Sequence, residues 1–163
     1  MPSGRVHELI NLTALGLGAF VWELEAPFTV NPQLELSFLA GYLIGTFLVT
    51  PDLDLAEGHV RAKRHWGPLG WLWIPYGLAF SHRGWSHTWL MGPLTRIIYI
   101  ILLSLVLWGM LEALAQHFGL RLTPPHLNPP QQLVASLVLG YYLSQWLHLM
   151  ADGIWPDRHR SRR

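Results

Sequence analysis

Four separate stretches of the chain carry side chains that can bind a metal ion. The candidate ligands are His7, Asp52, Asp54, His82, His87, His148 and Asp152. The chain has no cysteine, so every ligand is an imidazole or a carboxylate, a set that suits Zn, with Mn or Fe as alternatives. A divalent ion held this way activates water for the hydrolysis of an ester or phosphoester. Because one tetrahedral ion needs only four ligands, the set predicts one or two ions.

Two pairs of these residues have spacings that bring their side chains together. His148 and Asp152 are four residues apart in an apolar stretch, so on a helix they lie on the same face and can share an ion. Asp52 and Asp54 follow Pro51, which disfavours helical geometry in the residue before it and ends the preceding helix. In an extended segment, these two carboxylates would point to the same side.

The remaining ligands lie in less regular surroundings. His82 and His87 flank Gly84, which predicts a bending loop, and His7 lies just before the first apolar stretch. Arg83, next to His82, is the candidate catalytic residue, because a guanidinium can hold two oxygens of a phosphate at once. We therefore expect a phosphate-containing substrate.

Each group of candidate ligands also has a simpler interpretation. His148 with Asp152 can be a buried ion pair, the two aspartates after the second apolar stretch can solvate a loop or cap a turn, and His82 with Arg83 can be interfacial charge. His7 alone is more typical of a surface residue near a terminus. The metal site is favoured because four independent explanations would otherwise have to coincide, and because an ionisable group at membrane depth is costly.

The elements that position these residues are apolar helices. The chain is 51% hydrophobic and 13% charged, about half the charge of an ordinary soluble domain. Helical spans are expected over about 9–24, 34–50, 96–115 and 132–151. A span of about 18 residues is roughly 27 Å long, close to the ~30 Å hydrocarbon core of a bilayer. We predict an all-α, four-span transmembrane helical bundle that forms one domain over residues 1–163.

A very apolar soluble bundle is the alternative fold. Such a bundle should show a polar stripe on every helix, whereas the third apolar stretch offers only Tyr99 and Ser104 between Ile97 and Leu111. The membrane interpretation is therefore favoured.

The loop over 51–95 connects spans two and three and carries most of the predicted metal site. Its central part, 66–80, is apolar and aromatic but interrupted by Gly and Pro, so we predict a segment at the membrane interface. The aromatic residues expected at headgroup level are Trp66, Trp71, Trp73 and Tyr76; a ligand site is the alternative. Lys63 and Arg64 are expected to attract an anionic headgroup, and a basic tail covers 156–163.

Positive charge gives the orientation. With four crossings, ten of the eleven lysines and arginines fall on the side of the termini and the long loop, and Arg121 alone lies on the other side. We therefore expect an integral protein of a bacterial inner or thylakoid membrane, with its termini and metal site in the cytoplasm and with membrane lipid as a partner. The net charge of +1 gives no reason to expect nucleic-acid binding. The sequence does not identify a protein partner.

Several motifs resemble known families. The strings VTPDLDL, HRGWSH and GYYLSQWLHLMAD, with an early histidine after PSGRV, resemble the LexA-binding, inner-membrane-bound metal-dependent hydrolases. They resemble more closely a related metal-binding membrane family common in cyanobacteria, over residues 2 to 155. The resemblance implies metal ligation by the seven residues named at the outset. The hydrolases often have a histidine after the aspartate pair, where this chain has Leu55.

Three functions follow from these features. The leading prediction is a metal-dependent hydrolase that acts on a phosphoester or lipid-like substrate at the cytoplasmic face. The alternative is a metal-binding membrane scaffold, sensor or assembly factor without catalysis. Metal transport fits less well, because the candidate ligands gather at one membrane face.

Overall fold

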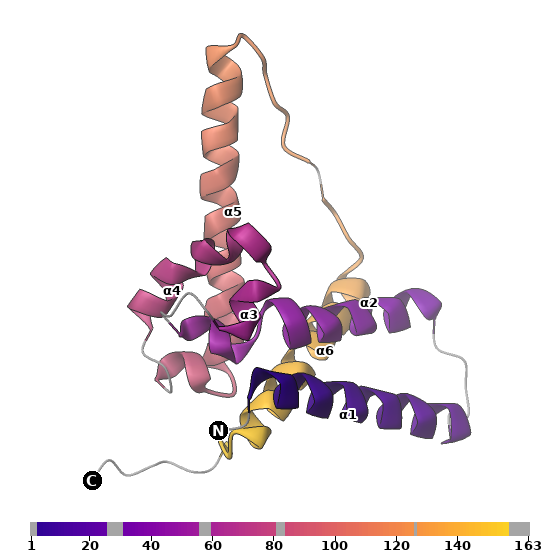
Figure 1. The fold of residues 1–163 in the computed structure, drawn as a ribbon. Coiled ribbons are helices and arrows are strands. Elements are labelled where there is room, and N and C mark those ends of the chain that lie inside the picture. Colours follow the sequence, from indigo (N-terminus) through magenta and orange to yellow (C-terminus); the bar gives the residue numbers. More distant parts are fainter. Residues whose placement is uncertain (1–2, 26–30, 56–59, 81–83, 126, 157–163) are drawn as a thin grey trace.

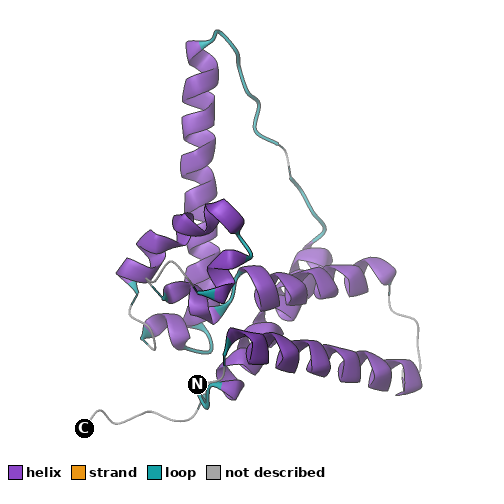
Figure 2. Cartoon of the chain, viewed as in Figure 1, coloured by secondary structure: helices purple, strands orange, loops and turns teal. Residues whose placement is uncertain are grey.

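The regular structure is entirely helical in the residues that the structure, a computed structural model, describes: 3–25, 31–55, 60–80, 84–125 and 127–156. The α-helices are α1 (Gly4–Glu25), α2 (Pro32–Leu43), α3 (Arg61–Arg64), α4 (Ile74–Ala79), α5 (Met91–His117) and α6 (Gln131–Ala151). A π-helical turn, η1 (Ile44–Leu48), and the 3₁₀ helices η2 (Pro51–Asp54), η3 (Gly67–Trp73) and η4 (Trp85–His87) complete the set. Figures 1 and 2 show the arrangement. The all-α prediction is confirmed, and helical structure covers most of each of the four predicted stretches.

The second apolar stretch becomes a helix with defined ends. Asn31 caps α2 by accepting a hydrogen bond of 2.9 Å from the backbone N–H two residues later, and Pro32 presets φ in the first turn. α2 continues into the wider turn η1. Thr50 is extended, as the following Pro51 predicts, and the helix ends before it.

The expectation that Asp52 and Asp54 lie in an extended segment is wrong. Pro51 begins the 3₁₀ helix η2 instead, and Leu55 N–H donates to the carbonyl of Asp52 at 3.2 Å. Residues two apart in a helix with three residues per turn point about 120° apart. The two carboxylates therefore face different neighbours.

Glycines allow α2 and α6 to pack backbone against backbone. A Cβ on Gly41 would lie 1.9 Å from the carbonyl oxygen of Leu137, and one on Gly140 would lie 2.1 Å from that of Phe38. A Cβ on Gly45, in η1, would lie 2.0 Å from a serine hydroxyl of α6. At Gly41 and Gly140 no side chain larger than hydrogen fits unless the helices move apart, whereas at Gly45 a larger side chain would displace the Ser144 hydroxyl.

The contact between α2 and α6 also has features of helix packing in membranes. Small residues recur at four-residue spacing in both elements: Gly41, Gly45, Gly140 and Ser144. Ser37 Oγ donates to the carbonyl of Leu133, and Ser136 Oγ donates to that of Leu34, both at 2.7 Å. Small-residue spacings and interhelical serine bonds are both typical of transmembrane helix pairs.

Helix α5 is far more exposed. Its buried residues are Gly92, Pro93, Arg96 and Ala115, and none of its most apolar 18-residue window is buried. Figure 1 shows α5 projecting away from the other elements, with α1 and α2 running at a large angle to it. Within the described residues, α5 does not complete a parallel bundle with the other long helices.

Two helices, α5 and α6, are long and apolar enough to cross a membrane, judged by length and composition. α2 has 12 residues and η1 adds 5, and α1 carries Glu8, Glu23 and Glu25 over its 22 residues. The structure therefore shows two candidate spans among its described residues.

The aromatic segment packs against the protein core. Trp73 and Tyr76 are fully buried and form a core cluster with Leu53 and Tyr141, so their rings contact protein rather than the surroundings. Trp71, by contrast, is exposed. The segment folds into the short helices η3 and α4, which pack their rings against the 3₁₀ helix that carries Asp52 and its neighbours.

Candidate metal centre

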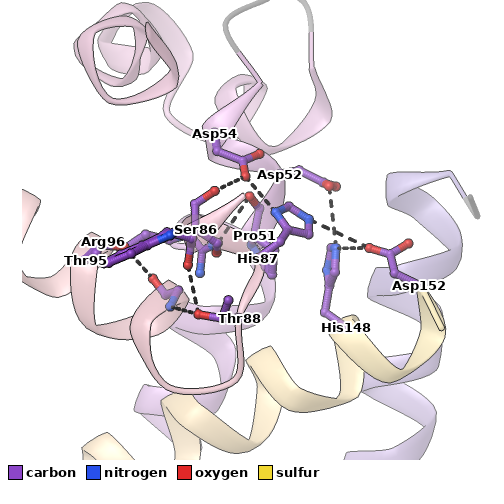
Figure 3. Close-up of polar contacts among 12 residues, drawn as sticks. Pro51, Asp52, Asp54, Ser86, His87, Thr88, Thr95, Arg96, His148 and Asp152 are labelled. Atoms are coloured by element: carbon purple, nitrogen blue, oxygen red, sulfur yellow. Dashed lines mark hydrogen bonds and ion pairs between the residues drawn. The ribbon is translucent and has the colours of Figure 1, made fainter. Parts of the chain in front are cut away.

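Five of the predicted ligands converge from four elements that are far apart in the sequence. His7 comes from α1, Asp52 from η2, His87 from η4, and His148 and Asp152 from the end of α6. Figure 3 shows Asp52, His87, His148 and Asp152 pointing toward one another. The α2–α6 packing supports this convergence, because η2 follows α2 through η1 and the end of α6 lies beside it.

We call His7, His148 and Asp152 the ligand cluster, since their candidate ligand atoms all lie within 4.8 Å of one another. His7 Nε2 is 3.2 Å from Asp152 Oδ1, and His148 Nε2 is 3.6 Å from Asp152 Oδ2. Ligands about 2.1 Å from a tetrahedral zinc ion are roughly 3.4 Å apart. The donor atoms are thus spaced as they would be around one ion. As predicted, His148 and Asp152 share one face at the end of α6.

Asp52 and His87 border the ligand cluster. Asp52 Oδ1 is 3.5 Å from His148 Nε2, and His87 Nε2 is 4.0 Å from Asp152 Oδ2. The rings of His7 and His148 are stacked, with centroids 3.8 Å apart. Asp52 and His87 therefore lie beside the ligand cluster, each next to one of its members.

Burial makes the ligand cluster unusual. His7 and His148 are each 4% exposed, and the side chain of Asp152 is fully buried. His148 Nε2 and both oxygens of Asp152 have no hydrogen-bond partner within the described part of the chain. Buried polar atoms in folded proteins almost always have partners, so several orphans at one point require an explanation. A divalent cation would satisfy them, and the donor types fit one.

Asp54 lies behind His87 and orients it. Asp54 Oδ2 is 2.6 Å from His87 Nδ1 and accepts a hydrogen bond of 2.5 Å from Ser86 Oγ. The bond to Nδ1 turns the opposite nitrogen of the ring, Nε2, toward Asp152. Carboxylates in this position commonly fix the tautomer and direction of metal-binding histidines. The geometry therefore gives Asp54 an orienting role beside the ligands.

Family comparison matches residues 2–162 to a family described as "Uncharacterized metal-binding protein (DUF2227)". The chain belongs to the DUF2227 family. It is also 36% identical over 71 residues to an uncharacterized protein of Aquifex aeolicus (strain VF5), which is 44% of this chain and 49% of that protein. The match thus covers about half the length of that relative. No solved structure matches the chain.

The electrostatics of this DUF2227 centre favour ionised carboxylates. Burial by itself raises the pKa of Asp52, but contact with His148 and the nearby histidine charges lower it more, so it lies below its ordinary value. The pKa of Asp152 is also lowered overall, since burial raises it less than His7 and His148 lower it. Two negative charges therefore face the point where the imidazoles meet.

A small opening leads from the surface to this point. It has about 220 Å³ of empty space, counted with the solvent at its mouth, and is lined by His7, Asp52 and His148. Thr50 also lines it, and its buried hydroxyl has no hydrogen-bond partner among the described residues. Arg61 lies at the rim, where it donates two hydrogen bonds of 2.6 Å to Glu8. Water can therefore reach His7 and His148 from this side.

The described part of the structure does not place several of the predicted residues at the metal centre. His82 and Arg83 lie outside the described residues. Lys63 is 2% exposed and its ammonium donates to the carbonyl of Leu55 at 2.5 Å, so the expectation that it attracts lipid headgroups is wrong. Burial lowers the pKa of Lys63, and the charge of Asp54 opposes this shift. Arg64 is exposed.

Sequence analysis missed two buried polar residues next to the centre. Asn11, one helical turn after His7, donates to Thr46 Oγ1 and to the carbonyl of Ser144, both at 3.2 Å, and ties α1 to both neighbouring elements. Arg96 is 1% exposed on α5. A polar residue within an apolar helix is a signal that could have identified each of them.

Proposed function

We propose that this protein binds one divalent metal ion, preferentially Zn²⁺, at the ligand cluster. The observation that carries the proposal is a buried group of atoms, His148 Nε2 and both oxygens of Asp152, that have no hydrogen-bond partner among the described residues, with His7 Nε2 3.2 Å from Asp152 Oδ1. Asp52 and His87 complete the donor set. Because Asp54 is directed to Ser86 and His87, the donors form one group, which favours one ion over two.

Metal analysis after purification in detergent tests this proposal. Wild-type protein should contain about one Zn²⁺ per chain, while His148→Ala and Asp152→Asn should contain almost none. His117→Ala is the matched control, because His117 is exposed near the far end of α5. Wild-type protein that takes up no Zn²⁺, Mn²⁺ or Fe²⁺ would refute the proposal, as would equal zinc content in all four proteins.

We also propose that the protein is embedded in a bacterial inner or thylakoid membrane by four spans, with the metal centre and termini on the cytoplasmic side. The apolar surface of α5, the small-residue packing of α2 on α6 and the distribution of Lys and Arg support this. α5 lies at a large angle to α1 and α2 in Figure 1, so four spans require it to realign in lipid.

Cysteine labelling from the two sides of the membrane tests the topology. The chain has no cysteine, so single cysteines can be introduced at Gly4, Glu25 and Gly119 without a background signal. Four spans predict that a membrane-impermeant reagent reaches position 4 from the cytoplasm and positions 25 and 119 from the opposite side. Labelling of position 25 from the cytoplasm would show that α1 does not cross.

The activity we propose is hydrolysis of a phosphoester or lipid-like substrate. When bound, a divalent ion supplies Lewis-acid activation of water and of a substrate oxygen. The side chain of Asp52 is 20% exposed at the opening and ionised, so it can accept a proton from water there. Arg83 is the proposed phosphate clamp.

A screen of phosphoesters and phosphatidic acid vesicles with each metal restored tests this activity. Asp52→Asn should retain part of the bound metal and lose most turnover, whereas Glu112→Gln, on α5, should retain both. Wild-type protein with a full metal content and no turnover on any substrate would favour a scaffold, sensor or assembly factor instead.

A further inference from the structure

Arg96 is a buried cation whose recorded hydrogen-bond acceptors are all uncharged. Its guanidinium donates to the side-chain oxygen of Gln145 at 3.1 Å, to the carbonyl of Ser86 at 2.5 Å and to that of Pro51 at 3.4 Å. The residue is 1% exposed. Removing a guanidinium from water costs free energy, and uncharged acceptors recover less of it than a carboxylate would. The arrangement needs a reason other than ion pairing.

The three acceptors share one property: each lies next to a metal-site residue. Pro51 directly precedes Asp52, and Ser86 directly precedes His87. Gln145 lies one helical turn before His148 on α6. One side chain of α5 therefore contacts every ligand-bearing segment except α1, and Figure 3 shows it on the side of these segments away from His148 and Asp152.

The backbone of α5 is shaped to permit these contacts. A Cβ on Gly92, one turn before Arg96, would lie 2.3 Å from the carbonyl oxygen of Ser86. Glycine at this position therefore lets that carbonyl approach α5 closely enough to accept from the guanidinium. Gln145 extends the network, because its amide also donates to the carbonyl of Gly45 in η1 at 2.9 Å.

The charge and the shape of Arg96 should have opposite effects on metal affinity. A cation near the ligand cluster repels a divalent ion, so by charge alone Arg96 would weaken metal binding. The planar guanidinium, however, offers five donors in fixed directions, and a lysine ammonium cannot reproduce that geometry. The sign of the change in affinity after substitution therefore distinguishes the two roles.

We propose that Arg96 is a positioning residue of the metal centre, whose guanidinium fixes Asp52, His87 and His148 in binding geometry through the backbone and side chain beside them. The proposal rests on the metal site proposed above. It assigns to α5 a function besides anchoring in the membrane, because the first turns of this helix hold the ligands in place.

Zinc titration of detergent-purified Arg96→Lys and Arg96→Gln tests the proposal. Both variants should bind Zn²⁺ about 10- to 100-fold more weakly than wild type, as is typical when a residue that orients metal ligands is lost. If charge decided, Arg96→Gln would bind more tightly and Arg96→Lys would be unchanged, and either result would overturn the proposal. The visible spectrum of the Co²⁺-loaded protein should also change in both variants, because it reports ligand geometry.

Tyr99→Phe is the matched control for general destabilisation. Tyr99 is on the same helix and donates to the carbonyl of Leu72 in η3, a segment that carries no candidate ligand. It should lower the melting temperature of the metal-free protein without changing zinc affinity or the Co²⁺ spectrum. Wild type that binds no metal would refute the metal site itself, whereas wild type and Arg96 variants with equal affinity would refute only the positioning role. If Arg96→Gln does not fold, Arg96→Lys decides alone.

Discussion

Helices α5 and α6 are the two long apolar helices of the described chain, yet α6 packs against the rest of the protein and α5 is mostly exposed. A third of the most apolar 18-residue window of α6 is buried, and that helix carries Ser144, Gln145 and His148 on its packed side. None of the corresponding window of α5 is buried. α5 is also the more apolar of the two helices. Small residues at regular spacing and internal polar groups mark the helix that packs against protein.

The largest expected difference between α6 and α5 is in how much the replacement of a glycine lowers the free energy of unfolding. Gly140→Leu should lower the free energy of unfolding by at least about 3 kcal/mol, the upper end of ordinary overpacking, because the new Cβ would lie 2.1 Å from a backbone oxygen of α2. Gly109→Leu should not destabilise the protein, because a Cβ at Gly109 on α5 meets nothing within 4 Å. Thermal or denaturant unfolding in detergent measures both.

The paired glycine variants also test whether α5 is exposed in the native protein. If Gly109→Leu destabilises as strongly as Gly140→Leu, then α5 packs tightly against another helix and the contrast between the two helices fails. Gly109→Ala gives a milder check, since alanine should raise stability by up to about 1 kcal/mol in an unpacked helix.

The sequence predicted the four helical stretches well, because long apolar runs between prolines leave few alternatives. It did not predict their arrangement. The contact of α2 with α6 depends on Gly41 and Gly140, and their positions in the sequence do not show which helix each one faces. α5 is the more apolar of the two helices, but a helix that is apolar on all sides can be buried or exposed, so hydropathy alone does not predict its exposure.

The structure brings five of the seven predicted ligands together, and the sequence did not predict how their contacts divide. The four-residue spacing of His148 and Asp152 determined their geometry, since both lie on one helix face. The 3₁₀ helix that Pro51 begins points Asp52 and Asp54 in different directions. Only the structure shows that Asp54 contacts His87 Nδ1. That contact depends on how distant loops fold together, which local spacing does not encode.

Zinc binding should slow hydrogen exchange at the end of α6 and leave it unchanged in most of α5. At about a hundred times its Kd, Zn²⁺ should stabilise the protein by about 2.7 kcal/mol, and Asp152→Asn should abolish this gain. Hydrogen exchange should slow around His148 and Asp152, where the ion would tie α6 to α1, and should not change in α5 beyond Ile101. Slower exchange along all of α5, with none at the end of α6, would place the ion elsewhere.

The smallest expected difference between α6 and α5 is in how much the replacement of a serine lowers the free energy of unfolding. Ser136 on α6 donates to the carbonyl of Leu34 at 2.7 Å, whereas Ser104 is exposed on α5. Ser136→Ala should lower the free energy of unfolding by about 0.6 to 1.5 kcal/mol, the usual range for an interhelical hydrogen bond, and Ser104→Ala should change it by less than about 0.5 kcal/mol. Equal effects would mean that the hydroxyl on α6 contributes nothing through its bond to α2. Close backbone packing at the glycines would then hold α2 against α6 without help from the serines.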